Sequence, residues 1–117
     1  MQQALKNAKL EKKRVLIIAG GLWCQWCGSL NNFFEENSEI EKNFFRKFEV
    51  LKVYYGNGIS EKGMKFLRQF PVLKGTPHFY VLNNNAKLLY SIDTTILESG
   101  YGYTRKKIKA FIAKYAQ

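Results

Sequence analysis

The chain has 117 residues, of which 46% are hydrophobic and 24% charged, a composition typical of one globular domain and not of a disordered chain. Its 19 basic and 9 acidic residues give a formal net charge of +10. The basic residues are spread along the sequence without a nucleic-acid-binding motif, so we expect a solvated basic surface and no nucleic-acid partner. We therefore expect a single domain over residues 1–117.

Membrane and export segments are not expected in this sequence. No apolar run approaches the roughly 20 residues that are needed to cross a bilayer. Residues Gln2–Arg14 are polar and basic where a signal peptide requires an apolar segment. We therefore predict no transmembrane segment.

Residue composition and the positions of glycines predict the first two helices and the strand between them. Residues Gln2–Lys13 are rich in Ala, Leu, Lys and Glu, which favours a helix. Val15–Ala19 is an unbroken apolar run, typical of a strand that is covered on both faces, and Gly20 and Gly21 end it. A helix is then predicted over Cys24–Glu36.

The middle of the chain is predicted to hold two more helices and a strand. Ser38 and Glu41 have the spacing of a capping box, so a helix should begin at Ser38. It is expected to turn three apolar side chains inward: Ile40, Phe44 and Phe45. The strand Phe48–Tyr55 ends at the glycines of residues 56–58, and the helix Ser60–Phe70 ends at Pro71.

The last third of the chain is predicted to form a hairpin and a helix. Phe79–Leu82 and Lys87–Ser91 are apolar runs that flank the turn signal of residues 83–85. Thr94–Tyr103 is expected to be a loop, after which Thr104 caps an amphipathic helix. The apolar face of that helix consists of Ile108, Phe111, Ile112 and Tyr115. The order of elements predicts a mixed α/β sheet of about four strands with helices on both faces.

The cysteines are the strongest chemical signal in the sequence. Cys24 and Cys27 are the only two, and they follow closely on the first predicted strand. In the opening turn of a helix, unpaired N–H groups favour a cysteine thiolate, the form that attacks disulfides. Cys27, one turn later on the same face, is placed to attack a mixed disulfide formed at Cys24. The spacing predicts a dithiol–disulfide exchange site.

Zinc is the other common partner of a Cys-x-x-Cys pair, and a structural zinc site normally takes four ligands. The sequence offers only His78 as a further soft ligand, so cysteine and histidine cannot complete such a site. We predict neither a metal nor a cofactor.

Three motifs together resemble the thioredoxin superfamily. Trp23–Cys27 at the exit of a buried strand resembles its active site, and Gly75–Pro77 before an apolar strand resembles its cis-proline loop. Gly102–Tyr115 is similar to its C-terminal element. The leading helix and the stretches Phe33–Phe45 and Leu97–Tyr103 are most similar to bacterial thioredoxin-like thiol:disulfide interchange proteins that work outside the cytoplasm. The resemblance implies a thioredoxin-like fold with an extra N-terminal helix.

The resemblance also implies roles for individual residues. Cys24 would be the nucleophile and Cys27 the resolving thiol. Pro77, after a cis bond from Thr76, would lie against the two sulfurs and present backbone to an extended substrate. The substrate-binding residues implied are Trp23, Gln25, Trp26, Thr76 and Pro77.

Departures from the thioredoxin pattern bear on the chemistry. Thioredoxins carry Gly-Pro between the cysteines, where this chain has Gln25 and Trp26, and this pair tunes the reduction potential. They also carry a buried acid on the preceding strand, where this chain has Ile18. Water or another group must therefore take the proton from Cys27. Gly28 replaces the basic residue that often follows the second cysteine.

Other residues near the motifs have more than one interpretation. His78 could titrate near neutral pH and bias Cys24 toward the thiolate. Because strand residues alternate between faces, His78 could instead point to solvent or pack as a neutral ring. Tyr101 and Tyr103 are expected to be packing or surface aromatics and not substrate contacts.

These observations predict a thiol:disulfide oxidoreductase that acts on protein thiols and disulfides as a reductase, with a further redox protein that recycles it. Two alternatives stay open. One is a disulfide oxidase or isomerase, because the sequence does not fix the reduction potential. The other is a non-catalytic thioredoxin-like binding module. The resemblance and the lack of other cysteines favour a periplasmic or otherwise extracytoplasmic location, with a cytoplasmic one as the alternative.

Overall fold

The structure is a computed structural model that describes residues 2–20, 25–54, 67–71, 77–99 and 102–116. Its helices are α1 (Gln2–Glu11), α2 (Gln25–Glu36), α3 (Ser38–Lys47) and α5 (Arg105–Tyr115). Its strands are β1 (Arg14–Gly20), β2 (Phe48–Tyr54), β3 (His78–Leu82), β4 (Leu88–Asp93), β5 (Glu98–Ser99) and β6 (Gly102–Tyr103). A short 3₁₀ helix, η1 (Thr94–Leu97), follows β4.

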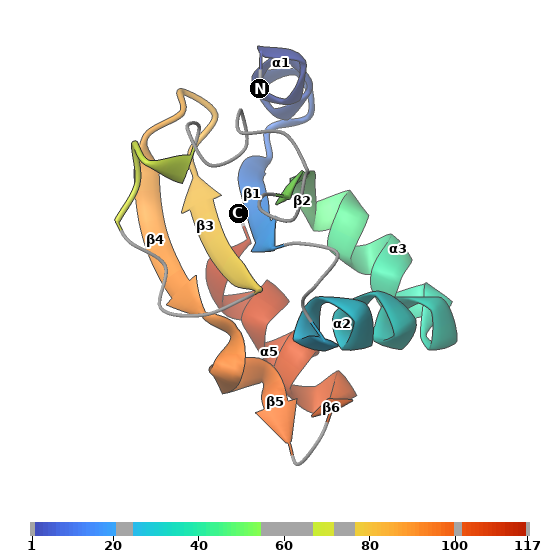
Figure 1. The fold of residues 1–117 in the computed structure, drawn as a ribbon. Helices are drawn as coiled ribbons and strands as arrows, with labels where there is room; N and C mark the ends of the chain where they lie inside the picture. Colours follow the sequence, from blue (N-terminus) through green and yellow to red (C-terminus); the bar gives the residue numbers. More distant parts are fainter. Residues whose placement is uncertain (1, 21–24, 55–66, 72–76, 100–101, 117) are drawn as a thin grey trace.

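Strands β1 to β4 form one mixed sheet in the order β2-β1-β3-β4. β1 pairs in parallel with β2 and antiparallel with β3, and β3 pairs antiparallel with β4 (Figure 1). The parallel pair is connected through α2 and α3, because parallel neighbours need a crossover. β1 is thus an interior strand, and every residue from Val15 to Gly20 is buried, as predicted for a strand covered on both faces.

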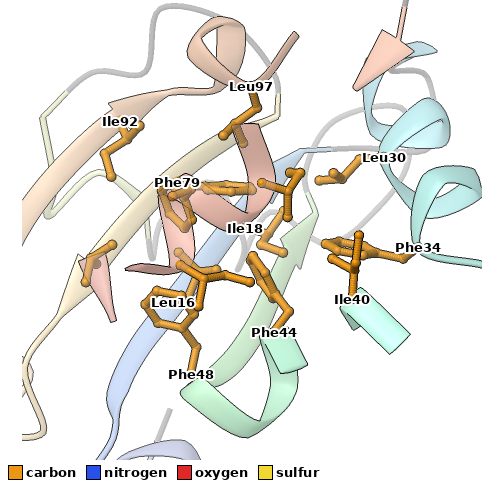
Figure 2. Packing of buried hydrophobic residues seen from close by; sticks show 14 residues of the cluster. Leu16, Ile18, Leu30, Phe34, Ile40, Phe44, Phe48, Phe79, Ile92 and Leu97 are labelled. Atoms are coloured by element: carbon orange, nitrogen blue, oxygen red, sulfur yellow. The ribbon is translucent and has the colours of Figure 1, made fainter. Parts of the chain in front are cut away.

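One side of the sheet, here called the α2 face, is covered by α2, α3 and α5 (Figure 2). The sheet contributes Leu16 and Ile18 of β1 with Phe79 and Val81 of β3 to this face. The helices contribute Leu30, Phe34, Ile40, Phe44, Ile108, Phe111 and Ile112. Phe44 joins the layers, since its ring lies 5.1 Å from that of Phe34 on α2 and 6.4 Å from that of Phe79 on β3. Aromatic packing therefore fixes α2 against the centre of the sheet.

The opposite side, here called the α1 face, is covered by α1 and by Leu67. The sheet contributes Val15, Ile17, Ala19, Tyr80 and Leu82 to this face. Ala8 of α1 is fully buried against them, and the ring of Phe70 stacks on that of Tyr80 at 4.9 Å. The predicted α/β fold is thus confirmed, with a mixed sheet, helical segments on both faces and a leading N-terminal helix.

Helix α3 differs from its prediction in two ways. Its N-cap is Asn37 and not Ser38, and no side chain caps it, since the Asn37 amide donates back to the Phe33 carbonyl at 2.8 Å. The predicted capping box is therefore wrong. Phe45 was expected inside but is 44% exposed, because Ile40 and Phe44 already fill the inward face of the helix.

The segment Thr94–Tyr103, predicted as a loop, contains η1 and the paired strands β5 and β6. Asp93 begins it as an N-cap, because its carboxylate accepts a hydrogen bond from the Thr95 N–H at 3.0 Å. Thr104 caps α5 as predicted, with its hydroxyl accepting from the Lys107 N–H at 3.3 Å. The predicted helix Ser60–Phe70 lies largely outside the described residues.

Candidate active site

The ends of β1 and β3 that adjoin the two predicted motifs lie at one end of the sheet. β1 and β3 are antiparallel, and their register pairs Ala19 with His78. The carboxyl end of β1, which leads to α2, therefore lies beside the amino end of β3, where Pro77 precedes the strand (Figure 1). Pro77 and the end of β1 are thus neighbours in the fold although they are far apart in the sequence.

Cys27 lies in the first turn of α2, is 4% exposed and is disulfide-bonded. The sequence holds one other cysteine, Cys24, which lies outside the described residues together with Trp23. The described part of α2 begins at Gln25, whose side chain is exposed. At the amino end of a helix, N–H groups without intrahelical partners favour negative charge.

Trp26, the second residue between the cysteines, is half-buried against Tyr103 of β6. The two rings meet edge-on at 5.5 Å with an interplanar angle of 82°. The Tyr103 hydroxyl donates to the Trp26 carbonyl at 3.3 Å. Burial raises the pKa of Tyr103 well above its usual value, partly offset by a hydrogen bond with Thr94. Tyr103 therefore packs against the first turn of α2, in accord with its expected role as a packing aromatic.

Pro77 is buried, and its carbonyl accepts a hydrogen bond from the Thr94 hydroxyl at 2.7 Å. Thr76 lies outside the described residues, so the expected cis bond between Thr76 and Pro77 stays a prediction. Pro77 directly precedes β3, as predicted from the sequence.

Ile18 occupies the position at which thioredoxins carry a buried acid. It is 4% exposed and packs on the α2 face with Leu30 and Phe34 of α2. The described side chains of this cluster are all apolar. The surroundings of α2 therefore offer no carboxylate at the expected position.

His78 lies on the α1 face, on the other side of the sheet from α2. Its ring contacts that of Tyr80 at 4.7 Å, and its Nε2 lies 2.7 Å from the Ser91 hydroxyl oxygen. Its Nδ1 is buried and has no hydrogen-bond partner among the residues that the structure describes. Burial lowers the pKa of His78, and the nearby Asp93 carboxylate raises it to a smaller extent. His78 is thus a buried, mainly neutral ring, and its influence on Cys24 stays a prediction.

A thioredoxin-like family model matches residues 1–84, which include the cysteine pair and the proline loop. The chain belongs to the thioredoxin-like family. A comparison with curated proteins gave no significant match.

Solved structures of other thioredoxin-like proteins share the fold. A disulphide isomerase from Xylella fastidiosa Temecula1 has a TM-score of 0.74 and 25% identity, over 97% of this chain and 86% of that one. The DsbH oxidoreductase has a TM-score of 0.64 and 22% identity, over 97% of this chain and 76% of that one. The oxidised C-terminal domain of DsbD from Neisseria meningitidis has a TM-score of 0.61 and 16% identity, over 94% of this chain and 88% of that one.

Among the described residues, no group of three or more His, Cys, Asp and Glu side chains is arranged to hold a metal ion. Within the same ranges, no helix has both the length and the apolar character needed to span a bilayer.

Sequence reasoning missed one residue that contacts the site. Thr94 was placed at the start of a loop, yet it is 2% exposed and bonds to Pro77. No local pattern distinguishes it from the exposed Thr95 beside it. Only the pairing of β3 with β4, which sets His78 against Asp93, brings Thr94 next to Pro77.

Proposed function

We propose that this thioredoxin-like protein is a thiol:disulfide oxidoreductase that acts on protein disulfides through Cys24 and Cys27. The observation that carries the proposal is Cys27. It is buried and disulfide-bonded in the first turn of a helix that follows a central strand, at the end of the sheet where Pro77 precedes β3. Family membership and the likeness to a disulphide isomerase support the same class of chemistry.

In the reductase direction, the Cys24 thiolate attacks one sulfur of a substrate disulfide. The substrate S–S bond breaks, a disulfide between Cys24 and the substrate forms, and the other substrate sulfur leaves as a thiolate. Cys27 gives up its proton and attacks the Cys24 sulfur, which releases the second substrate thiolate and closes the Cys24–Cys27 disulfide. Two electrons pass to the substrate, and each released thiolate takes one proton.

The residues around the cysteines assist this exchange. The amino end of α2 stabilises the Cys24 thiolate, since unpaired N–H groups carry partial positive charge. Trp23, Gln25, Trp26, Thr76 and Pro77 form the substrate-binding rim. Because Ile18 supplies no carboxylate, the proton of Cys27 passes to water or to the departing substrate thiolate.

A second candidate is disulfide isomerisation, which the likeness to the Xylella fastidiosa disulphide isomerase favours. In that direction Cys24 attacks a wrong substrate disulfide, and a substrate thiol, in place of Cys27, then attacks the mixed disulfide. The reduction potential separates the candidates, because about −270 mV is typical of a reductase and about −180 mV of an isomerase. We propose reduction, with a further redox protein as electron donor, in an extracytoplasmic compartment.

The experiment that tests the proposal is insulin reduction with dithiothreitol as electron donor. We expect Cys24→Ser to lose activity by about 100-fold or more, because it removes the nucleophile. Without dithiothreitol, reduced Cys27→Ser should accumulate a mixed disulfide with the substrate, since the resolving thiol is missing. Asn32→Ala, which changes an exposed residue on α2, serves as the control and should keep full activity. Full activity in Cys24→Ser would overturn the proposal in favour of a binding module.

A further inference from the structure

Thr94 connects the start of β3 to the end of β4. It is 2% exposed, and its hydroxyl donates to the buried Pro77 carbonyl at 2.7 Å. It is the first residue of η1, whose start is held by the Asp93 cap. Buried hydroxyls in proteins are almost always hydrogen-bonded, so this contact is part of what fixes the Pro77 carbonyl.

Tyr103 extends this connection to α2. Its hydroxyl donates to the Trp26 carbonyl at 3.3 Å. Tyr103 also pairs with Glu98 of β5, which directly follows η1, so Thr94 and Tyr103 belong to one compact unit of η1, β5 and β6. The ring of Tyr103 adds an edge-on contact with that of Trp26 at 5.5 Å. The unit of η1, β5 and β6 thus contacts Pro77 through Thr94 and the residue before Cys27 through Tyr103.

We propose that Thr94 and Tyr103 are positioning residues that hold Pro77 at a fixed position relative to the first turn of α2. This inference rests on the proposed function, because it concerns how a substrate bound along Pro77 is presented to the cysteine pair. The backbone of β3 and the helix carrying Cys27 come from separate parts of the chain. The hydrogen bonds of the Thr94 and Tyr103 hydroxyls keep these two parts in a fixed position relative to each other.

The expected effect depends on the size of the substrate. A polypeptide that binds along Pro77 brings its disulfide to Cys24 at a position set by Pro77, and a misplacement of about 1 Å can cost about 100-fold in rate. The reduction of a small disulfide that reaches Cys24 without binding along Pro77 does not depend on the position of Pro77. Loss of the link should therefore slow reduction of polypeptides selectively.

The test compares Thr94→Val, Tyr103→Phe and the double variant. Each change removes one hydroxyl and keeps the shape of the side chain. We expect kcat/KM for a disulfide-bonded peptide to fall about tenfold in each single variant, which is about 1.4 kcal/mol. With the small aromatic disulfide dithionitrobenzoate, the change should stay within about twofold. The double variant should lose about tenfold and not about 100-fold, because either change already breaks the link.

Matched controls remove hydroxyls elsewhere. Tyr90→Phe and Thr95→Val change exposed residues of β4 and η1 and should keep wild-type rates with both substrates. Thr94→Ser keeps the hydroxyl and should restore the peptide rate.

If Thr94→Val does not fold, the Tyr103→Phe variant alone tests the proposal, and a thermal melt verifies that this variant is folded. Equal losses with both substrates, additive losses or unchanged peptide rates would overturn the positioning role. A wild-type protein inert toward both substrates would instead overturn the proposed function, and the positioning role with it.

Discussion

The two faces of the sheet differ at the end of β1 that leads to α2. On the α2 face, Ile18 is 4% exposed among apolar side chains. On the α1 face, His78 is 3% exposed, carries a titratable ring and bonds to Ser91. These buried positions lie on neighbouring strands, since Ile18 pairs with Phe79 and the next pair is Ala19 with His78. The comparison teaches that, of these two buried positions, the one on the side of the sheet away from α2 carries the ionisable side chain.

The largest expected effect comes from placing a charge on the apolar side. Ile18→Asp would bury a carboxylate with no partner in the cluster, so the free energy of unfolding at pH 7 should fall by about 3 kcal/mol or more. Burial raises the pKa of such a carboxyl in the folded state. The loss should therefore be present at neutral pH and shrink as the pH falls through that raised pKa.

Urea unfolding at pH 7 and at pH 4 measures this effect. Ile18→Asn has the same shape without the charge and should show little of this pH dependence, while Ile18→Val should cost only about 1 kcal/mol. Equal stability of the Asp and Asn variants at both pH values would contradict the view that charge on the α2 face is what the fold excludes.

A smaller effect on the pH dependence of stability is expected from a substitution at His78, the buried titratable residue on the α1 face. Its pKa in the folded state is lowered from 6.5, mainly by burial. The stability that the neutral ring contributes is then fully present above pH 6.5 and is lost as the pH falls from there through the lowered pKa. His78→Gln should remove this part of the acid sensitivity, because its amide can still reach Ser91 but does not titrate in this range.

Thermal melts of wild type and His78→Gln between pH 7.5 and pH 5 would show the difference, and an NMR titration of the single histidine gives its pKa directly. A pKa at or above 6.5 would contradict the buried, neutral state.

The smallest effect concerns Gly28 in α2, next to Cys27. A Cβ at Gly28 meets no atom within 4 Å. Because glycine weakens a helix interior, Gly28→Ala should stabilise the fold by about 0.5–1 kcal/mol. Denaturant unfolding measures the gain, and Gly102→Ala in β6, where the space is also open, is the comparison outside a helix. A loss of stability in Gly28→Ala would show that the glycine serves the site and is not simply tolerated.

Local patterns were sufficient for most of the fold. The run Val15–Ala19 predicted a doubly covered strand, and Thr104 predicted the start of α5, because each rests on the properties of adjacent residues. The Cys-x-x-Cys motif and the Thr-Pro pair predicted the family, and the sheet places the described members, Cys27 and Pro77, at one end.

Tertiary packing decided the rest. Phe44 and Phe45 are adjacent and identical in type, so the sequence alone does not tell which one is buried. Only one of two adjacent helical positions can face the aromatic cluster, and Phe45 is 44% exposed. The helix begins at Ser38 as predicted, but the capping box failed because Asn37, and not Ser38, is the N-cap. Thr94 became part of the site through a hydrogen bond to a residue 17 positions away, which no local pattern encodes.

The burial of Cys27 also has a consequence for the lifetime of the protein under oxidative stress. Overoxidation of a cysteine to sulfinic or sulfonic acid is largely irreversible, and susceptibility follows thiolate character and exposure to the oxidant. At 4% exposure, Cys27 is poorly accessible to peroxide from solvent. The packing of α2 against the sheet therefore also protects the Cys27 sulfur from irreversible oxidation.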